Sequence, residues 1–205
     1  MTLGADLWSA NADLAAAALA HPFVQSLASG TLAREKFQGY IQQDAFFLDA
    51  FARAYALALA RCPDQAGLRD FFDLLHGVLD ELRLHESYAV EWGVERAAER
   101  PADATLDYTD FLRATAALGS VGEICAAMTP CMRLYAYLGQ SLETSVAADN
   151  PYVEWVRTYA AADFEALAAR LEHLLDRYAQ DSPAVRATYR RAMKLELAFF
   201  EAACR

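Results

Sequence analysis

The sequence places a cysteine directly after a proline, in the segment Thr129-Pro130-Cys131 that leads on to Tyr135. Proline has no N–H to donate and clashes with the preceding turn, so we expect a helix to kink or restart here and to leave Cys131 at a new N-terminus. Free N–H groups at that position would lower the pKa of the thiol, and Tyr135 would lie one turn further along the same face. Cys131 is therefore either a nucleophile or an inert core thiol, since free cysteine is among the most buried residue types.

Two carboxylates fall on apolar helical faces. Asp44 lies within a stripe of residues that recur at three- and four-residue steps: Phe37, Tyr40, Ile41, Phe47, Leu48, Phe51 and Tyr55. Glu196 lies in the same way on a stripe with Tyr189 and Phe200, whereas Glu201 is expected in solvent. A buried carboxylate is costly unless it is neutralised or hydrogen-bonded, so each needs a partner, either a ligand or a side chain of a neighbouring helix.

Other residues give weaker signals for chemistry. Glu81 and His85 are one turn apart, but the Glu-x-x-His spacing and the further inward ligands of a di-iron bundle are missing, so we expect no metal site. Tyr108 and Tyr159 are unremarkable when each is taken alone. The remaining cysteines match no zinc-ligand spacing, and no chemistry is assigned to Cys62, Cys125 and Cys204.

The segments that must position these residues are rich in Ala, Leu, Arg and Glu, and none has the alternation of a β-strand, so we predict an all-α fold. The chain has 205 residues with 56% hydrophobic content and no linker or internal repeat, which predicts one domain over residues 1–205. Glycine, proline and N-cap residues predict helices over 3–20, 33–62, 65–92, 105–117, 121–148, 151–178 and 183–204.

The charge of the chain excludes one class of partner. The net charge is −10 and the arginines are scattered, so the basic patch of a nucleic-acid-binding protein is missing. No basic segment followed by an apolar run begins the sequence, and no apolar stretch is long enough to span a membrane. We therefore expect a cytoplasmic protein with reduced thiols and no membrane or nucleic-acid partner.

A series of motifs resembles the TenA/thiaminase II family in order along nearly the whole chain. They are His21-Pro22-Phe23-Val24, Gly30-Thr31-Leu32, Phe37 to Tyr40, Gln42-Gln43-Asp44, Phe51-Ala52-Arg53, Leu84-His85-Glu86, Tyr108-Thr109, Pro130-Cys131, Leu134-Tyr135, Gly139, Tyr152 to Tyr159, and Glu196 followed by Phe199-Phe200. The Pro130-Cys131 motif is similar to the branch of the family that has a catalytic cysteine.

The resemblance implies a heme-oxygenase-like helical bundle that holds no heme, metal or other cofactor and assembles as a homotetramer. It implies an aminopyrimidine aminohydrolase, or thiaminase II, in thiamin salvage. Its small-molecule substrate would be the aminomethyl-aminopyrimidine left by thiamin degradation, or thiamin itself, and its product would be hydroxymethylpyrimidine.

The same resemblance assigns roles to residues. Cys131 would add to the pyrimidine ring as the nucleophile, Glu196 would transfer protons, and Asp44 would hold the ring's amino group and adjacent nitrogen. The pocket would be lined by Phe47, Tyr108, Tyr135 and Tyr159.

The sequence departs from the family pattern at a few positions, and it leaves two alternatives open. Phe47 stands where some members have a tyrosine, Met132-Arg133 replaces an aromatic pair, and Phe200 replaces a tryptophan, so the preferred pyrimidine stays undetermined. One alternative is a non-enzymatic transcriptional regulator, which the acidic chain without a helix-turn-helix signature disfavours. The other is a di-iron or cofactorless oxygenase on the same fold.

Overall fold

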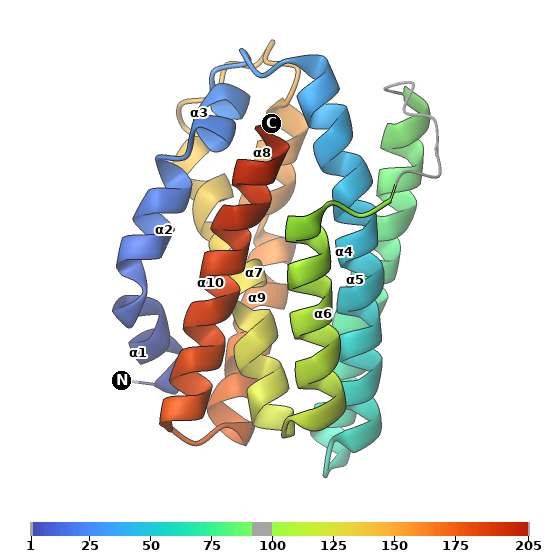
Figure 1. Cartoon of the computed structure of the whole chain (residues 1–205), viewed down its shortest axis with the longest axis vertical. Helices are drawn as coiled ribbons and strands as arrows, with labels where there is room; N and C mark the ends of the chain where they lie inside the picture. Colours follow the sequence, from blue (N-terminus) through green and yellow to red (C-terminus); the bar gives the residue numbers. More distant parts are fainter. Residues whose placement is uncertain (1, 92–99, 205) are drawn as a thin grey trace.

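The protein is a bundle of helices (Figure 1). The computed structural model describes residues 2–91 and 100–204, and for residues 84–91 it describes the backbone alone. No strand occurs in these ranges, which confirms the all-α prediction. The helices are α1 (Leu3–Ala10), α2 (Ala12–Leu19), α3 (Pro22–Ala28), α4 (Arg34–Arg61), α5 (Gln65–Glu91), α6 (Asp103–Leu118), α7 (Val121–Leu142), α8 (Val153–Ala160), α9 (Ala162–Tyr178) and α10 (Pro183–Ala203).

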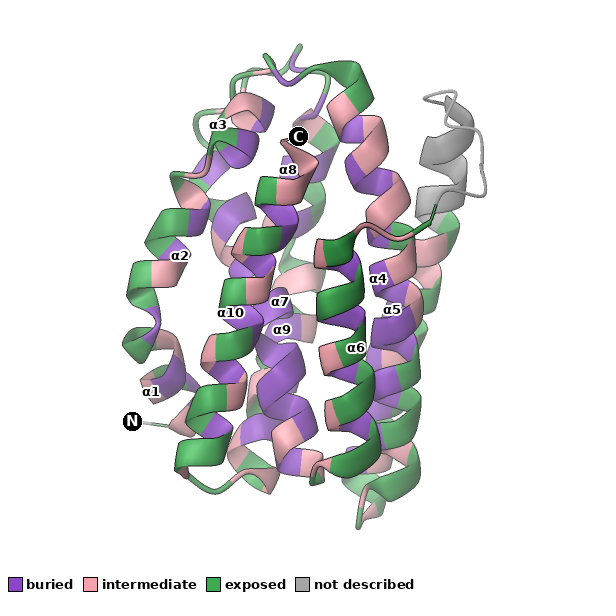
Figure 2. Cartoon of the chain, in the orientation of Figure 1, coloured by how far each residue is buried: buried purple, intermediate pink, exposed green. Residues whose placement is uncertain are grey.

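Helix α7 is the centre of the bundle. It packs against α4, α6, α8, α9 and α10, and every residue from Ile124 to Met132 is buried. A helix that is apolar on all sides can be stable in water only when other helices surround it. In Figure 2 the ribbon of α7 is coloured mostly as buried, whereas α6 and α10 each carry exposed residues along one face. Residues placed on α7 are thereby held at the middle of the protein.

Local signals in the sequence account for several helix starts. Ser120 accepts a hydrogen bond from the backbone N–H of Glu123 at 3.2 Å, and the Glu123 carboxylate accepts one from the N–H of Ser120 at 2.8 Å, which forms a capping box for α7. Ser182 caps α10 ahead of Pro183, which provides a preorganised first turn. These caps fix where the two helices that carry Cys131 and Glu196 begin.

Three predicted helix boundaries are wrong. The helix expected over 3–20 is broken at Asn11, whose side chain donates to the Leu7 carbonyl at 2.8 Å and so competes with helix continuation. The helix expected over 151–178 is interrupted at Ala161, which is extended at φ −63° and ψ 144°. The helix expected over 121–148 ends at Leu142, and a short helix, Pro22–Ala28, was not predicted.

The interruption at Ala161 has a tertiary cause. A Cβ on Gly139 of α7 would lie 2.5 Å from the backbone of Tyr159 and of Ala160, so the end of α8 packs directly on the α7 backbone. This contact sets the direction of α8 and thus the position of Tyr159. In the described residues no helix combines the length and apolar character that a membrane span requires.

Candidate active site

A cavity of ≈ 20 Å³ lies between α4, α5, α7, α8 and α9. This is about the space of one water molecule, so a ring-sized ligand can enter only if side chains move. Its lining is Asp44, Phe47, Leu48, Phe51, Glu81, Cys131, Met132, Tyr135, Tyr159 and Phe164. Among these side chains two are acidic, one is a thiol and none is basic, so the cavity combines a nucleophile with proton-transfer groups.

Cys131 contributes the thiol from the middle of α7, and not from the new helix end that the sequence predicted. Helix α7 continues through Pro130, and the Thr129 hydroxyl donates to the Cys125 carbonyl at 2.7 Å beside it. The pKa of Cys131 is raised well above its usual range, first by burial and then by the negative charges of Glu196 and Asp44. The expectation of a lowered thiol pKa is therefore wrong, because α7 does not restart at Pro130 and the nearby charges are carboxylates.

Glu196 reaches the thiol from α10. It accepts hydrogen bonds from the Cys131 thiol and from the Tyr108 hydroxyl, the latter at 2.7 Å. Burial raises the pKa of Glu196 to about 7, although both hydrogen bonds act in the opposite direction. A carboxyl with such a pKa exchanges protons readily at neutral pH, so Glu196 can accept the thiol proton and return it.

Two further carboxyl groups line the cavity. Asp44 of α4 is 4% exposed, and its pKa is raised well above the usual range by burial and by the charges of Glu81 and Glu196. Glu81 of α5 accepts a hydrogen bond at 3.0 Å from the hydroxyl of Tyr159, and burial raises the pKa of Glu81 to about 7. These groups can bind a ligand that brings hydrogen-bond donors or positive charge.

Aromatic rings make up much of the cavity lining and of the layer packed against it. The hydroxyls of Tyr40 and Tyr135 are 3.0 Å apart, and the indole N–H of Trp155 donates to the hydroxyl of Tyr40 at 3.4 Å. Tyr135 and Tyr159 meet edge to face with ring centroids 4.7 Å apart. A planar ring entering the cavity would thus meet both aromatic rings and carboxyl groups.

The structure brings together the site residues that the sequence predicted. Five line the cavity, and Tyr108 and Glu196 lie immediately behind the thiol. Sequence reasoning missed Glu81, which it weighed only as a metal ligand, although its spacing from Leu74 and Val78 places it on the apolar stripe of α5. The side chain of His85 lies outside the described residues, and the described ones contain no group of three His, Cys, Asp or Glu residues that could hold a metal.

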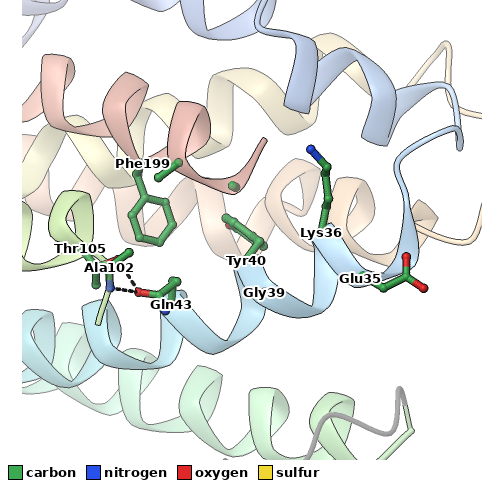
Figure 3. Close-up of a pocket in the computed structure, with 10 residues that line it drawn as sticks. Glu35, Lys36, Gly39, Tyr40, Gln43, Ala102, Thr105 and Phe199 are labelled. Atoms are coloured by element: carbon green, nitrogen blue, oxygen red, sulfur yellow. Dashed lines mark hydrogen bonds between the residues drawn. The ribbon is translucent and has the colours of Figure 1, made fainter. Parts of the chain in front are cut away.

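A larger groove of ≈ 450 Å³ lies beside this site, between α4, α6 and α10 (Figure 3). Its floor is held by the Gln43 side-chain oxygen, which accepts from the Ala102 N–H at 2.8 Å and from the Thr105 hydroxyl at 2.7 Å. Phe199 borders it, and the Phe199 ring is 6.1 Å from that of Phe47, which lines the cavity. The groove is larger, but Cys131, Asp44 and Glu81 line the cavity and Glu196 lies behind the thiol, so we place the chemistry there.

Comparison with known proteins gives a consistent match. The model of the TENA/THI-4/PQQC family matches residues 8–205. An aminopyrimidine aminohydrolase of Halalkalibacterium halodurans is 36% identical over 88% of this chain and 83% of its own length. The mitochondrial bifunctional TH2 protein of Arabidopsis thaliana is also 36% identical over 88% of this chain, which spans only 34% of that relative.

Solved structures agree with this match. The TenA homologue of P. horikoshii OT3 superposes with a TM-score of 0.90 at 25% identity, covering 99% of this chain and 98% of that one. Heme oxygenase-1 of Synechocystis sp. superposes with a TM-score of 0.66 at 15% identity, covering 98% and 92%. The second likeness concerns the fold alone, and it confirms the heme-oxygenase-like bundle.

Proposed function

Because the chain belongs to the TENA/THI-4/PQQC family, we propose that it is an aminopyrimidine aminohydrolase of the thiaminase II type. It hydrolyses the bond between the methylene carbon of an aminomethyl-aminopyrimidine and its amine, and yields hydroxymethylpyrimidine and ammonia. The observation that carries the proposal is the chain of hydrogen bonds from Tyr108 to Glu196 to Cys131, which ends at a cavity that Asp44 also lines.

The reaction begins at the thiol. As the sulfur of Cys131 adds to an electron-poor carbon of the pyrimidine, its proton passes to Glu196, which is already its hydrogen-bond acceptor. The cavity lining contains no described cation that would stabilise a preformed thiolate, so proton transfer and attack must occur together. Glu196 thus acts first as a base and then, once protonated, as an acid.

The second half of the reaction restores the enzyme. Charge delocalised into the ring expels the amine from the methylene carbon, and water then adds to that carbon. The sulfur of Cys131 finally leaves the ring, and Glu196 returns the proton to the thiol. Asp44, a buried carboxyl that lines the same cavity from α4, holds the ring's amino group and the adjacent nitrogen. The rings of Phe47, Tyr135 and Tyr159 enclose the pyrimidine.

The direct test is ammonia release from the aminomethyl-aminopyrimidine by the purified protein. Cys131→Ser should lose at least about 10³-fold in kcat while its free energy of unfolding changes by less than about 1 kcal/mol, because the residue keeps its size and loses only the nucleophile. Cys125→Ser is the matched control, since Cys125 is buried on the same helix without a hydrogen bond to Glu196. Full activity of Cys131→Ser would rule out the covalent route.

A homotetramer stays a prediction from the family. Light scattering of the purified protein tests it, and activity measured across dilution shows whether assembly is needed for catalysis.

A further inference from the structure

We propose that Glu81 makes the cavity selective for a cationic substrate, by serving as the counter-ion of the positively charged group on the pyrimidine's methylene carbon. This inference rests on the proposed function, and it assigns a specificity-determining residue that the hydrolytic steps do not use. It implies that the substrate is bound as an ammonium ion and that the neutral hydroxymethyl product is released because it has lost this charge.

The position of Glu81 supports such a role. Its carboxyl lines the same cavity as Cys131 and Asp44 but comes from a different helix, α5. The hydroxyl of Tyr159 donates to one of its oxygens at 3.0 Å and so holds the group in place. A carboxylate offers about four acceptor positions, so one such bond leaves capacity for an ammonium donor.

The surroundings of Glu81 are unfavourable to its charge. Asp44 faces it from α4, Cys131 from α7 and Tyr159 from α8, while Glu196 lies behind the thiol on α10. No basic side chain occurs among the described residues that line the cavity. Burial in this setting disfavours the charged form of Glu81 and raises its pKa to about 7, and a cationic ligand would stabilise that charged form.

The chemistry of the proposed reaction matches this charge pattern. An aliphatic amine such as that of lysine has a pKa of about 10.4, so an aminomethyl group is largely an ammonium ion at neutral pH. Hydrolysis balances as pyrimidine–CH2–NH3⁺ plus water giving pyrimidine–CH2–OH plus NH4⁺. The positive charge leaves with the ammonium ion, and the organic product that stays in the cavity is neutral.

The test compares two ligands in the Cys131→Ser background, where turnover does not interfere with binding. Calorimetry gives the Kd of the aminomethyl and hydroxymethyl forms of the same aminopyrimidine between about pH 5.5 and 8, a range that spans the titration of a carboxyl with a raised pKa. At the upper end the ammonium ligand should bind at least about tenfold more tightly. This ratio should shrink as the pH falls and the carboxyls are protonated.

Substitution then assigns the effect to one carboxyl. Glu81→Gln keeps the size of the side chain and an acceptor for Tyr159, and it should reduce the ammonium preference at least about fivefold while the Kd of the hydroxymethyl form stays within about twofold. The matched control is Asp80→Asn, which removes a charge from the same turn of α5 where Asp80 pairs with Arg83 in solvent. The control should leave the ratio unchanged.

Several results would overturn the inference. Equal affinity of the Cys131→Ser protein for both ligands throughout the pH range, with Glu81 unchanged, would do so without any variant at position 81. Equal losses in Glu81→Gln and Asp80→Asn would point to a long-range field, and a parallel loss for both ligands in Glu81→Gln would point to a structural role through Tyr159. Failure of the proposed function is a separate outcome, since it appears as absence of ammonia release by the wild-type protein.

Discussion

The substitution Glu196→Gln should make the protein more stable at alkaline pH and at the same time abolish its activity. Glu196 is 2% exposed and accepts hydrogen bonds from Tyr108 and Cys131. Glutamine has nearly the same shape and can still accept from Tyr108, but it carries no negative charge and cannot take a proton from the thiol. Stability and catalysis should therefore change in opposite directions at one position.

The magnitude follows from the pKa of Glu196, which burial raises from 4.5 to about 7 in the folded protein. Because the folded-state pKa is raised, the folded state binds more protons than the unfolded state between these values, and stability is lost as the pH rises through about 7. The cost relative to a neutral side chain is about 3 kcal/mol at pH 8 and about 1 kcal/mol at pH 5. Glu196→Gln should thus gain about 2.5 kcal/mol more at pH 8 than at pH 5.

Urea denaturation followed by circular dichroism at both pH values measures this difference, in which any constant cost of burying the amide cancels. Glu201→Gln is the matched control, since Glu201 is five residues further along α10 and its side chain is 57% exposed, and it should show no such pH-dependent gain. Equal destabilisation of Glu196→Gln at the two pH values would refute this prediction. Glu196 would then be a structural partner of Tyr108, and its buried charge would not destabilise the folded protein.

Three further substitutions test other parts of the site. Tyr108→Phe removes a hydrogen bond that lowers the pKa of Glu196. We therefore expect kcat to fall about tenfold and the acid limb of the pH–activity profile to move to higher pH. An acid limb at the wild-type pH would contradict the assignment of Glu196 as the base. Gly139→Ala places a Cβ 2.5 Å from the backbone of Tyr159, and it should cost about 2 kcal/mol in urea unfolding and lower activity by displacing α8. Tyr189→Phe should keep or raise the free energy of unfolding by about 1 kcal/mol, because the Tyr189 hydroxyl is buried without a hydrogen-bond partner in the described structure; a loss greater than this would reveal a partner.

The sequence by itself determined the helical class and the inward position of the key carboxylates. Apolar residues recurring every three or four positions can be buried together only on a helix, and a carboxylate on such a stripe must be buried with them. For this reason Asp44 and Glu196 could be identified before the fold was known, and both are at most 4% exposed. The same reasoning applied to Leu74 and Val78 on α5 would have found Glu81.

Only the tertiary structure decided what these residues do to one another. The pKa of Cys131 depends on burial and on charges contributed by α4, α5 and α10, which are far apart in the sequence. The sequence around Pro130 predicts a new helix end, which would lower the pKa of the thiol, but α7 continues through this proline. The break between α8 and α9 likewise follows from the contact of α8 with Gly139, since the alanine at position 161 gives no local signal for it. The periodicity of apolar residues shows which face of a helix is buried. The pKa values and the close contacts on that face depend instead on which other helices pack against it.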